Sequence, residues 1–248
     1  MITLPCLDNG EPFPPACQAL KEPDGLLAFG GDLSTARLLQ AYKLGIFPWY
    51  SADQPVLWWS PSARMVLQCD DFRISPSLAK LLKRVARNER QQDAAITITT
   101  DTCFEAVMRA CAAPRGAQAG TWITDEMIAA YTELHRQGYA HSIETWVDGQ
   151  LAGGLYGNCI GRMFYGESMF STSSNTSKIA LAWLVRFLKA NQVTWIDCQQ
   201  DTPHLASMGA RPQARAAFLR HVSETVNQPA LLWPAGQMLG DGTIVPPM

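Results

Sequence analysis

The sequence has no long apolar run and no recognisable targeting segment at its start. A membrane-spanning helix needs about 20 consecutive apolar residues, and nowhere in the 248 positions does such a run occur. The first residues, "MITLPCLDNGEPFPPA", lack the basic lead and the apolar stretch of a secretory signal peptide. We therefore expect a protein of the cytoplasm that makes no contact with a membrane.

Metal-ligand spacings are missing as well. The seven cysteines stand singly, without a C-x-x-C pair, and the four histidines show no spacing such as H-x-x-x-H. Isolated thiols suit a reducing compartment better than they suit a disulfide framework. We expect neither disulfides nor a protein-bound metal ion.

A strong overall charge is absent too, because the net charge is only −2, but the basic residues are unevenly spread. The segment "FRISPSLAKLLKRVARNER" contains a single acid, Glu89. We expect a helix over 76–90 with an apolar face toward the core and a basic face formed by Lys80, Lys83, Arg84 and Arg87. Such a face is either simply solvated or a docking surface for a phosphate backbone, and the helix alone does not decide between them.

The pattern of elements predicts two domains of an α+β protein. Residues 1–62 are rich in Pro, Gly and Trp and predict a small N-terminal α/β domain, followed by a second domain over 63–248. The second domain shows a helix, a three-stranded antiparallel meander over 140–170, an amphipathic helix over 174–190, a strand over 193–199 and another helix. This order predicts a mostly antiparallel sheet flanked by helices, of the N-acetyltransferase (GNAT) type.

Polar residues end the strand "VTWIDCQ". On a regular strand Asp197 and Gln199 share one face, while Ile196 and Cys198 occupy the other. A carboxylate that orients a carboxamide, which in turn orients a substrate amine, is chemically reasonable there. The alternative is a polar strand end that only bonds to neighbouring loops.

A single carboxylate, Glu167, lies in the apolar stretch "GRMFYGESMF". A buried ionised carboxylate is costly unless it is paired or hydrogen-bonded, so Glu167 is either a satisfied structural anion or part of a site. On a regular strand it shares a face with Met163, Tyr165 and Met169, although Gly166 could permit a bulge. Phe170 replaces the last glycine of a G-x-S-x-G nucleophile elbow, which argues against a serine hydrolase.

Glycine is absent from "STSSNTSK", the junction between the predicted meander and its following helix. In this fold, coenzyme A would need a Gly-rich loop there, with backbone amides that face its pyrophosphate. We therefore disfavour an acyl-CoA donor and expect no bound cofactor.

A set of ordered motifs resembles the leucyl/phenylalanyl-tRNA–protein transferases. The resemblance covers roughly residues 13–215 and rests on "EPDGLLAFGGDLS", "LLQAYKLGIFPWYS", "LWWSP", "GTWIT", "AHSIETW", "GGLYG", "FYGESMFS", "SK" and "IDCQ...HLASMGA". One small departure is Ala63, which stands where such chains often carry Pro. The last twenty or so residues carry no family signal.

The resemblance implies an aminoacyltransferase. Members move Leu or Phe, and weakly Met, from leucyl-tRNA or phenylalanyl-tRNA to proteins whose N-terminal residue is Arg or Lys. The product carries an N-degron that the adaptor ClpS delivers to a Clp protease. An aminoacyl ester is already activated, so transfer to an amine needs neither ATP nor coenzyme A, and the main task is to position the reactants.

The resemblance also implies residue roles. Asp197 and Gln199 would hold the acceptor's α-amine, and Glu167 would contact an ammonium group or the terminal ribose. The pocket for the donor side chain would be lined by Leu155, Phe164, Met169 and Leu184. Aromatic residues at the tRNA 3′-adenosine would be Tyr42, Trp49 and Trp122, although aromatics are more often core. The basic face with Lys80, Lys83, Arg84 and Arg87 would contact the tRNA backbone.

Two other functions are compatible with parts of the sequence. A tRNA-dependent ligase of cell-wall peptide bridges shares the expected fold, but it would usually be longer, with two such domains and a coiled-coil insertion. A non-catalytic RNA-binding module would not need Glu167, Asp197 and Gln199.

Overall fold

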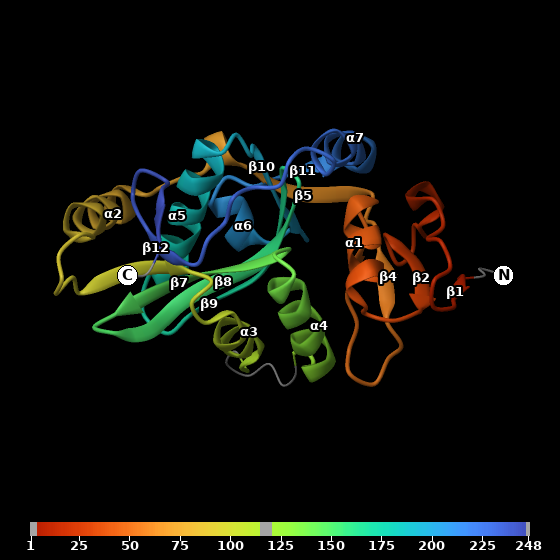
Figure 1. Cartoon of the computed structure of the whole chain (residues 1–248). Coiled ribbons are helices and arrows are strands. Elements are labelled where there is room, and N and C mark those ends of the chain that lie inside the picture. The colour runs from red at the N-terminus through yellow and green to blue at the C-terminus, as the bar shows by residue number, and fades with distance from the viewer. Residues whose placement is uncertain (1–3, 115–120, 247–248) are drawn as a thin grey trace.

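The computed structural model describes residues 4–114 and 121–246, which build two sheets (Figure 1). The smaller sheet lies at the N-terminal end, with the strand order β1 (Cys6–Leu7), β2 (Leu26–Gly30), β4 (Leu57–Trp59) and β3 (Phe47–Pro48). Helix α1 (Thr35–Lys43) packs beside it and begins at Ser34, whose side chain accepts a hydrogen bond from Arg37 N. A short 3₁₀ helix spans Ala16–Gln18.

The larger sheet has nine strands within the described residues, in the order β11-β5-β10-β9-β8-β7-β6-β12-β13. Their bounds are β5 Ala63–Gln68, β6 Ile96–Thr100, β7 Ala140–Val147, β8 Gln150–Ile160, β9 Met163–Ser171, β10 Trp195–Gln199, β11 Arg211–Ala214, β12 Gly236–Met238 and β13 Ile244–Val245. Strands β9 and β10 pair in parallel, and the other pairs described in this sheet are antiparallel.

Helices cover both faces of the larger sheet (Figure 1). One face carries α3 (Phe104–Ala112) and α4 (Asp125–Arg136), and the other carries α2 (Pro76–Asn88) and α5 (Thr176–Ala190). The remaining elements are the 3₁₀ helix Cys69–Asp71 and the helices α6 (Pro203–Ser207) and α7 (Arg215–Thr225). The predicted α+β class is confirmed, as is the order α4, β7 to β9, α5, β10, α7. No helix in the described ranges combines the length and apolarity needed to cross a bilayer.

Helix ends follow the capping residues that the sequence supplies. Thr124 caps α4 by accepting a hydrogen bond from Met127 N, and two acids follow it in the first turn. Ser75 caps α2 in the same way, with Pro76 at its first position. Helix α2 ends at Asn88 instead of residue 90, and Glu89 is bonded to the C-terminal segment through Gly240 N.

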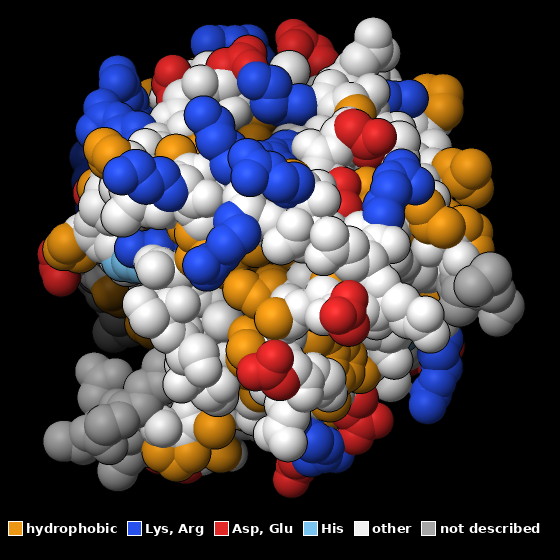
Figure 2. All heavy atoms as spheres, turned by 90° about the vertical axis from the view of Figure 1, so that its left-hand side faces the viewer, with side chains coloured by type: hydrophobic (Ala, Val, Ile, Leu, Met, Phe, Trp, Pro, Cys, Tyr) orange, Lys and Arg blue, Asp and Glu red, His pale blue; other side chains and the backbone are white. Residues whose placement is uncertain are grey.

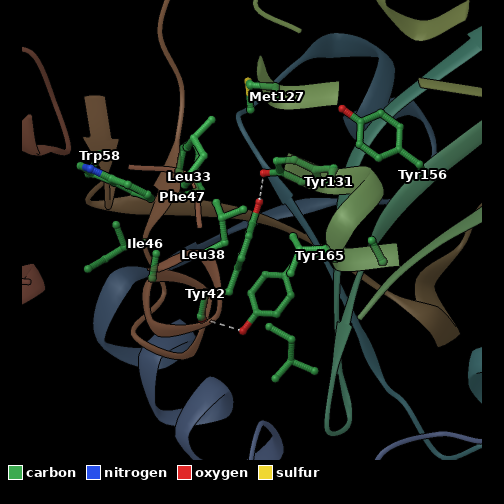
Figure 3. Packing of buried hydrophobic residues seen from close by; sticks show 14 of the residues in the cluster. Leu33, Leu38, Tyr42, Ile46, Phe47, Trp58, Met127, Tyr131, Tyr156 and Tyr165 are labelled. Carbon is green, nitrogen blue, oxygen red and sulfur yellow. Dashed lines mark hydrogen bonds between the residues drawn. The ribbon is translucent and has the colours of Figure 1, made fainter. Parts of the chain in front are cut away.

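The two sheets share one core cluster, which bears on the expected boundary at residue 62. The sheets are separate on either side of Pro61, but Tyr42 from α1 packs with Tyr131 from α4 and Tyr165 from β9 (Figure 3). Residues 1–62 and 63–248 therefore stay a proposed division, because their apolar side chains are buried together.

Two β-bulges change which side chains share a face of the sheet. Between β8 and β9, Tyr156 pairs with Ser168 and Gly157 pairs with Gly166. Glu167, on β9, is therefore the extra residue. The strand is therefore not regular, and Met163, Tyr165, Glu167 and Met169 do not all share one face; the alternative that Gly166 permits a bulge is the one that the structure shows. The bulge turns Met169 to the α5 side of the sheet, whereas Met163 and Tyr165 belong to the core on the opposite side.

The second bulge lies in β10. Asp197 pairs with Val66 and Gln199 with Met65, which leaves Cys198 as the extra residue. The prediction that Asp197 and Gln199 share a face is also wrong, because Gln199 takes the next position in the ladder after Asp197 and adopts a left-handed φ of 52°. Both bulges lie at one end of the sheet, beside the polar residues Glu167 and Gln199.

The last residues complete the far edge of the larger sheet. Strand β12 pairs with β6, and β13 pairs with β12. Trp233, which precedes β12, donates from Nε1 to Thr100 Oγ1 at 2.7 Å and stacks on His141 with 4.1 Å between the ring centroids. The segment thus covers the edge of β6 and packs into the core on the α5 side.

A matched pair of glycines tests this sheet geometry. We expect Gly157→Ala to lower the free energy of unfolding by about 1–3 kcal/mol, because a Cβ there would lie 2.3 Å from the carbonyl oxygen of Tyr165. Its partner in the ladder, Gly166, is the control. A Cβ at Gly166 would approach no heavy atom closer than 3.4 Å, so Gly166→Ala should change stability by less than about 1 kcal/mol. Equal urea midpoints for the two variants would contradict the register.

Candidate active site

An apolar cavity opens where β9 and β10 separate. These strands pair at Phe164–Ile196 and at Tyr165–Asp197, and the bulges follow directly. The cavity has a volume of about 280 Å³. The four side chains predicted to hold the donor residue, together with two further apolar neighbours, line this one cavity: Leu155, Phe164, Met169, Leu184, Leu181 and Ile196.

Polar side chains also line the same cavity. Glu167 and Ser168 come from β9, and Gln199 comes from the end of β10. The loop after β10 and the start of α6 add Gln200, Thr202 and His204. The structure therefore places two of the three predicted catalytic residues, Glu167 and Gln199, at one apolar pocket.

The third predicted catalytic residue, Asp197, lies behind the cavity. Its side chain is fully buried and binds Arg64 in a bidentate ion pair, with Nε–Oδ1 at 2.8 Å and Nη2–Oδ2 at 2.7 Å. Both carboxylate oxygens bind Arg64 and the side chain has no exposed surface, while the predicted contact of Asp197 with the substrate amine stays a prediction. Arg64 carries no local sequence signal for this role and was missed.

Asp197 acts on the site through the backbone. Its Oδ1 accepts a hydrogen bond from Gln199 N at 2.9 Å, across the bulge, and this contact holds Gln199 in its left-handed conformation. Such a conformation costs about 1–3 kcal/mol in a residue other than glycine and persists only where the surroundings enforce it. Asp197 therefore fixes the backbone position of Gln199.

Gln199 is poised for a ligand. Its side chain is 92% buried, and within the described residues its Nε2 has no hydrogen-bond partner. Buried polar groups are almost always satisfied in folded proteins. Gln199 lines the cavity, so its unpaired carboxamide is a candidate partner for a ligand there.

Glu167 is a hydrogen-bonded, partly buried group that also lines the cavity. It accepts from Tyr42 Oη at 2.6 Å and from Asn158 Nδ2 at 2.9 Å. Tyr42 in turn bonds to the Tyr131 hydroxyl, while the Tyr165 hydroxyl donates to the backbone oxygen of Tyr42 (Figure 3). Burial raises the pKa of Glu167 to about 8, even though the Tyr42 hydrogen bond works in the opposite direction.

The three aromatics expected at the tRNA 3′-adenosine have different environments. Tyr42 is fully buried between Glu167 and Tyr131, so its ring exposes no face to solvent, and its predicted contact with adenosine stays a prediction. Trp49 is 39% exposed and Trp122 is partly exposed. Both line the cavity and also a neighbouring groove of about 930 Å³.

The C-terminal segment supports the pocket wall from behind. Phe164 stacks on Trp233 with 5.9 Å between ring centroids, and Trp233 also contacts Phe187 at 4.5 Å. Sequence reasoning missed this support, because the segment shows no motif. The wall that would face a bound side chain therefore depends on three rings that are distant in sequence.

The basic face of α2 is exposed. Lys80, Lys83, Arg84 and Arg87 project into solvent, and none of the ion pairs among the described residues involves them. Figure 2 shows the end of the molecule that carries α2, where Lys and Arg side chains gather in the upper part of the view. A surface of uncompensated positive charge is typical of phosphate recognition.

Family models identify the chain. The model described as "Leucyl/phenylalanyl-tRNA protein transferase" matches residues 66–223, and the model of that protein's N-terminal domain matches residues 31–62. The chain belongs to this family. It is 58% identical to the leucyl/phenylalanyl-tRNA–protein transferase of Bordetella avium (strain 197N) over 98% of each chain.

Other relatives agree with this assignment. The transferase of Bordetella bronchiseptica (strain ATCC BAA-588 / NCTC 13252 / RB50) is 55% identical over 99% of this chain and 96% of that protein. Among solved structures, FemX shows a TM-score of 0.43 at 10% identity, over 73% of this chain and 66% of that one, which is too weak a likeness to argue from.

The raised pKa of Glu167 predicts a pH-dependent cost in stability. In the unfolded chain this carboxyl ionises near its ordinary pKa of 4.5, whereas the folded protein keeps the proton up to about pH 8. Between these values only the unfolded state has released the proton, so the stability contributed by this group falls as pH rises.

We therefore expect Glu167→Gln to gain stability relative to the wild type as pH rises from 5 to 8.5. The difference in Tm between the two proteins should grow by at least about 3 °C across this range. The control is Glu224→Gln at an exposed position of α7. A Tm difference that stays constant with pH would show that Glu167 ionises normally.

Proposed function

We propose that this protein transfers Leu or Phe, and weakly Met, from aminoacyl-tRNA to the α-amine of proteins that begin with Arg or Lys. The observation that supports this most is the apolar cavity that Glu167 and Gln199 both line, with the carboxamide nitrogen of Gln199 lacking a partner among the described residues. An apolar side chain can be buried there while the ester and the incoming amine meet at the polar mouth.

The size and the walls of the cavity fit a single amino-acid side chain. At about 280 Å³ it lies at the lower end of typical small-molecule sites. Leu155, Met169 and Leu184 are flexible at their ends and suit a guest that is unbranched at Cβ. Phe164, held by Trp233, forms a flat wall against which a Phe or Leu side chain can pack.

The chemistry is ester aminolysis. The acceptor nitrogen attacks the ester carbonyl carbon, the bond from that carbon to the ribose oxygen breaks, and an amide forms. The amine loses a proton and the ribose oxygen gains one. Gln199 Nε2 would donate to the carbonyl oxygen as negative charge develops on it. Glu167, with a pKa close to the 7.7–8.0 typical of an α-amine, would exchange a proton with the acceptor.

The donor RNA would be held outside the cavity by two further surfaces. Trp49 and Trp122 would take the 3′-adenosine, because stacking of a base on an aromatic ring contributes about 1–3 kcal/mol. The basic face of α2 would contact the backbone with Lys80, Lys83, Arg84 and Arg87. Backbone contacts carry no base information, so several tRNA isoacceptors would be accepted.

The proposed product implies a role in protein degradation. A protein with a new N-terminal Leu or Phe would carry an N-degron for ClpS and a Clp protease. The whole reaction would take place in the cytoplasm, where charged tRNA is available.

A transfer assay tests the proposal. Purified protein, [14C]Phe-tRNA and a peptide that begins with Arg should yield a labelled peptide without ATP or coenzyme A. We expect Gln199→Ala to lower kcat about 100-fold, since one donor to the developing oxyanion is removed, while the Kd for tRNA is unchanged. Absence of label from the peptide with the wild-type protein would reject the function. Equal loss of tRNA affinity and of turnover in Gln199→Ala would reject the assigned role of Gln199.

A further inference from the structure

Trp233, in the C-terminal segment before β12, supports the donor cavity from outside. It is not one of the residues that line the cavity. Its ring packs on Phe164, with 5.9 Å between the centroids and 22° between the planes. Phe164 is fully buried and lines the cavity. Trp233 therefore lies one layer behind the wall that a donor side chain would touch.

The same indole supports a second wall. It contacts Phe187 of α5, with 4.5 Å between the ring centroids. Phe187 follows Leu184 by three positions, so the two side chains share a face of the helix. Leu184 lines the cavity. Trp233 thus packs against β9 and against α5, which both contribute apolar walls.

The indole itself is held in one orientation. Its Nε1 donates to Thr100 Oγ1 at 2.7 Å, and its ring stacks on His141 with 4.1 Å between the centroids and 8° between the planes. Thr100 is fully buried, and its hydroxyl in turn donates to the backbone oxygen of Ser142 at 2.7 Å. Because protein interiors are close-packed, a side chain fixed in this way restrains the rings that touch it.

Phe164 is also restrained by β8. A Cβ built on Gly157 would lie 2.7 Å from Phe164 Cζ, so the Phe164 ring already packs directly on the backbone of β8. The ring therefore has two restraints, the backbone at Gly157 and the indole of Trp233. A smaller side chain at position 233 would remove the second restraint and leave the first one in place.

We infer that Trp233 is a positioning residue that sets the preference of the enzyme among donor side chains. The inference rests on the proposed function. A fixed Phe164 gives the cavity a fixed size, and a pocket of fixed size distinguishes guests that differ by one methylene about 10- to 200-fold. If Phe164 could retreat, a larger guest would gain room and a smaller guest would lose contacts.

Transfer from different donors to one peptide that begins with Arg tests the inference. We expect Trp233→Leu to raise the ratio of kcat/KM for Phe-tRNA to kcat/KM for Leu-tRNA at least about fivefold, because Phe164 can move into the vacated space. The same variant should transfer Trp from Trp-tRNA with a kcat/KM at least about threefold above that of the wild type. A smaller amount of folded protein lowers every kcat/KM by one factor, so the ratio reports the shape of the cavity.

Matched variants separate the support of the ring from the stability of the fold. Trp233→Phe keeps an aromatic ring beside Phe164 and should hold the Phe-to-Leu ratio within about twofold of the wild type. Leu232→Ala is the control in the same segment, because Leu232 is 85% exposed. This control should leave both kcat/KM values unchanged.

A second variant carries the test if Trp233→Leu does not fold. Thr100→Val removes the acceptor of the indole N–H while it keeps the size of the side chain. We expect it to raise the Phe-to-Leu ratio about twofold, since the indole is held less firmly. An unchanged ratio in a folded Thr100→Val would count against the role of Trp233.

Each further outcome bears on one proposal. A folded Trp233→Leu in which the ratio is unchanged or lower would overturn the role of Trp233 and leave the transferase function intact. A wild-type protein that transfers neither Leu nor Phe would reject the proposed function itself, and the role of Trp233 with it.

Discussion

Arg64 and Asp197 lie 133 residues apart in the chain and meet on the neighbouring strands β5 and β10, with both charges out of contact with solvent. The guanidinium also donates to Gly45 O and lies over the rings of Phe47 and Phe218, at 4.4 and 4.7 Å from their centroids. One ion pair thus ties the N-terminal region, the larger sheet and α7 together. Buried pairs of this kind add little stability compared with apolar replacements. The contribution of this pair therefore lies in fixing the positions of the residues around it.

The ion pair acts on the cavity through Gln199. Asp197 also accepts a hydrogen bond from the backbone N–H of Gln199, and the bulge at Cys198 turns the Gln199 side chain to the cavity. The carboxamide nitrogen of Gln199 has no partner among the described residues. Across the gap, a second bulge turns Glu167 to the same opening, where burial keeps its pKa near 8. A strained backbone, an unpaired donor and a poorly solvated acid are each costly in an empty protein. Together they suit a site that is completed by its substrates.

Local patterns were enough to predict the elements that carry these residues. Thr124 and the acids after it mark the start of α4, and Asp148-Gly149 marks the hairpin between β7 and β8. The apolar residues around Glu167 and the polar end of the strand at Gln199 drew attention to two side chains that line one cavity in the structure. These signals depend on residues that are close in sequence. They can therefore be interpreted without knowing which strand lies opposite.

What failed depends on partners that are distant in sequence. A bulge is defined by the strand opposite it, and only Gly166 hinted at one of the two. Arg64 gave no sign that it would neutralise Asp197, and Trp233 gave none that it would support Phe164. The resemblance gives Tyr42 a place at the adenosine, but a motif does not show whether an aromatic residue is exposed or, as here, enclosed by Tyr131 and Glu167.

The most direct measurement is the turnover of a double variant, Arg64→Leu with Asp197→Leu, beside its unfolding curve. Replacing both charges with apolar side chains should leave stability within about 2 kcal/mol of the wild type. If the pair exists to hold Gln199, kcat for transfer from Phe-tRNA should still fall as far as in the single variant Asp197→Leu. A double variant that is folded and turns over at the wild-type rate would contradict the account.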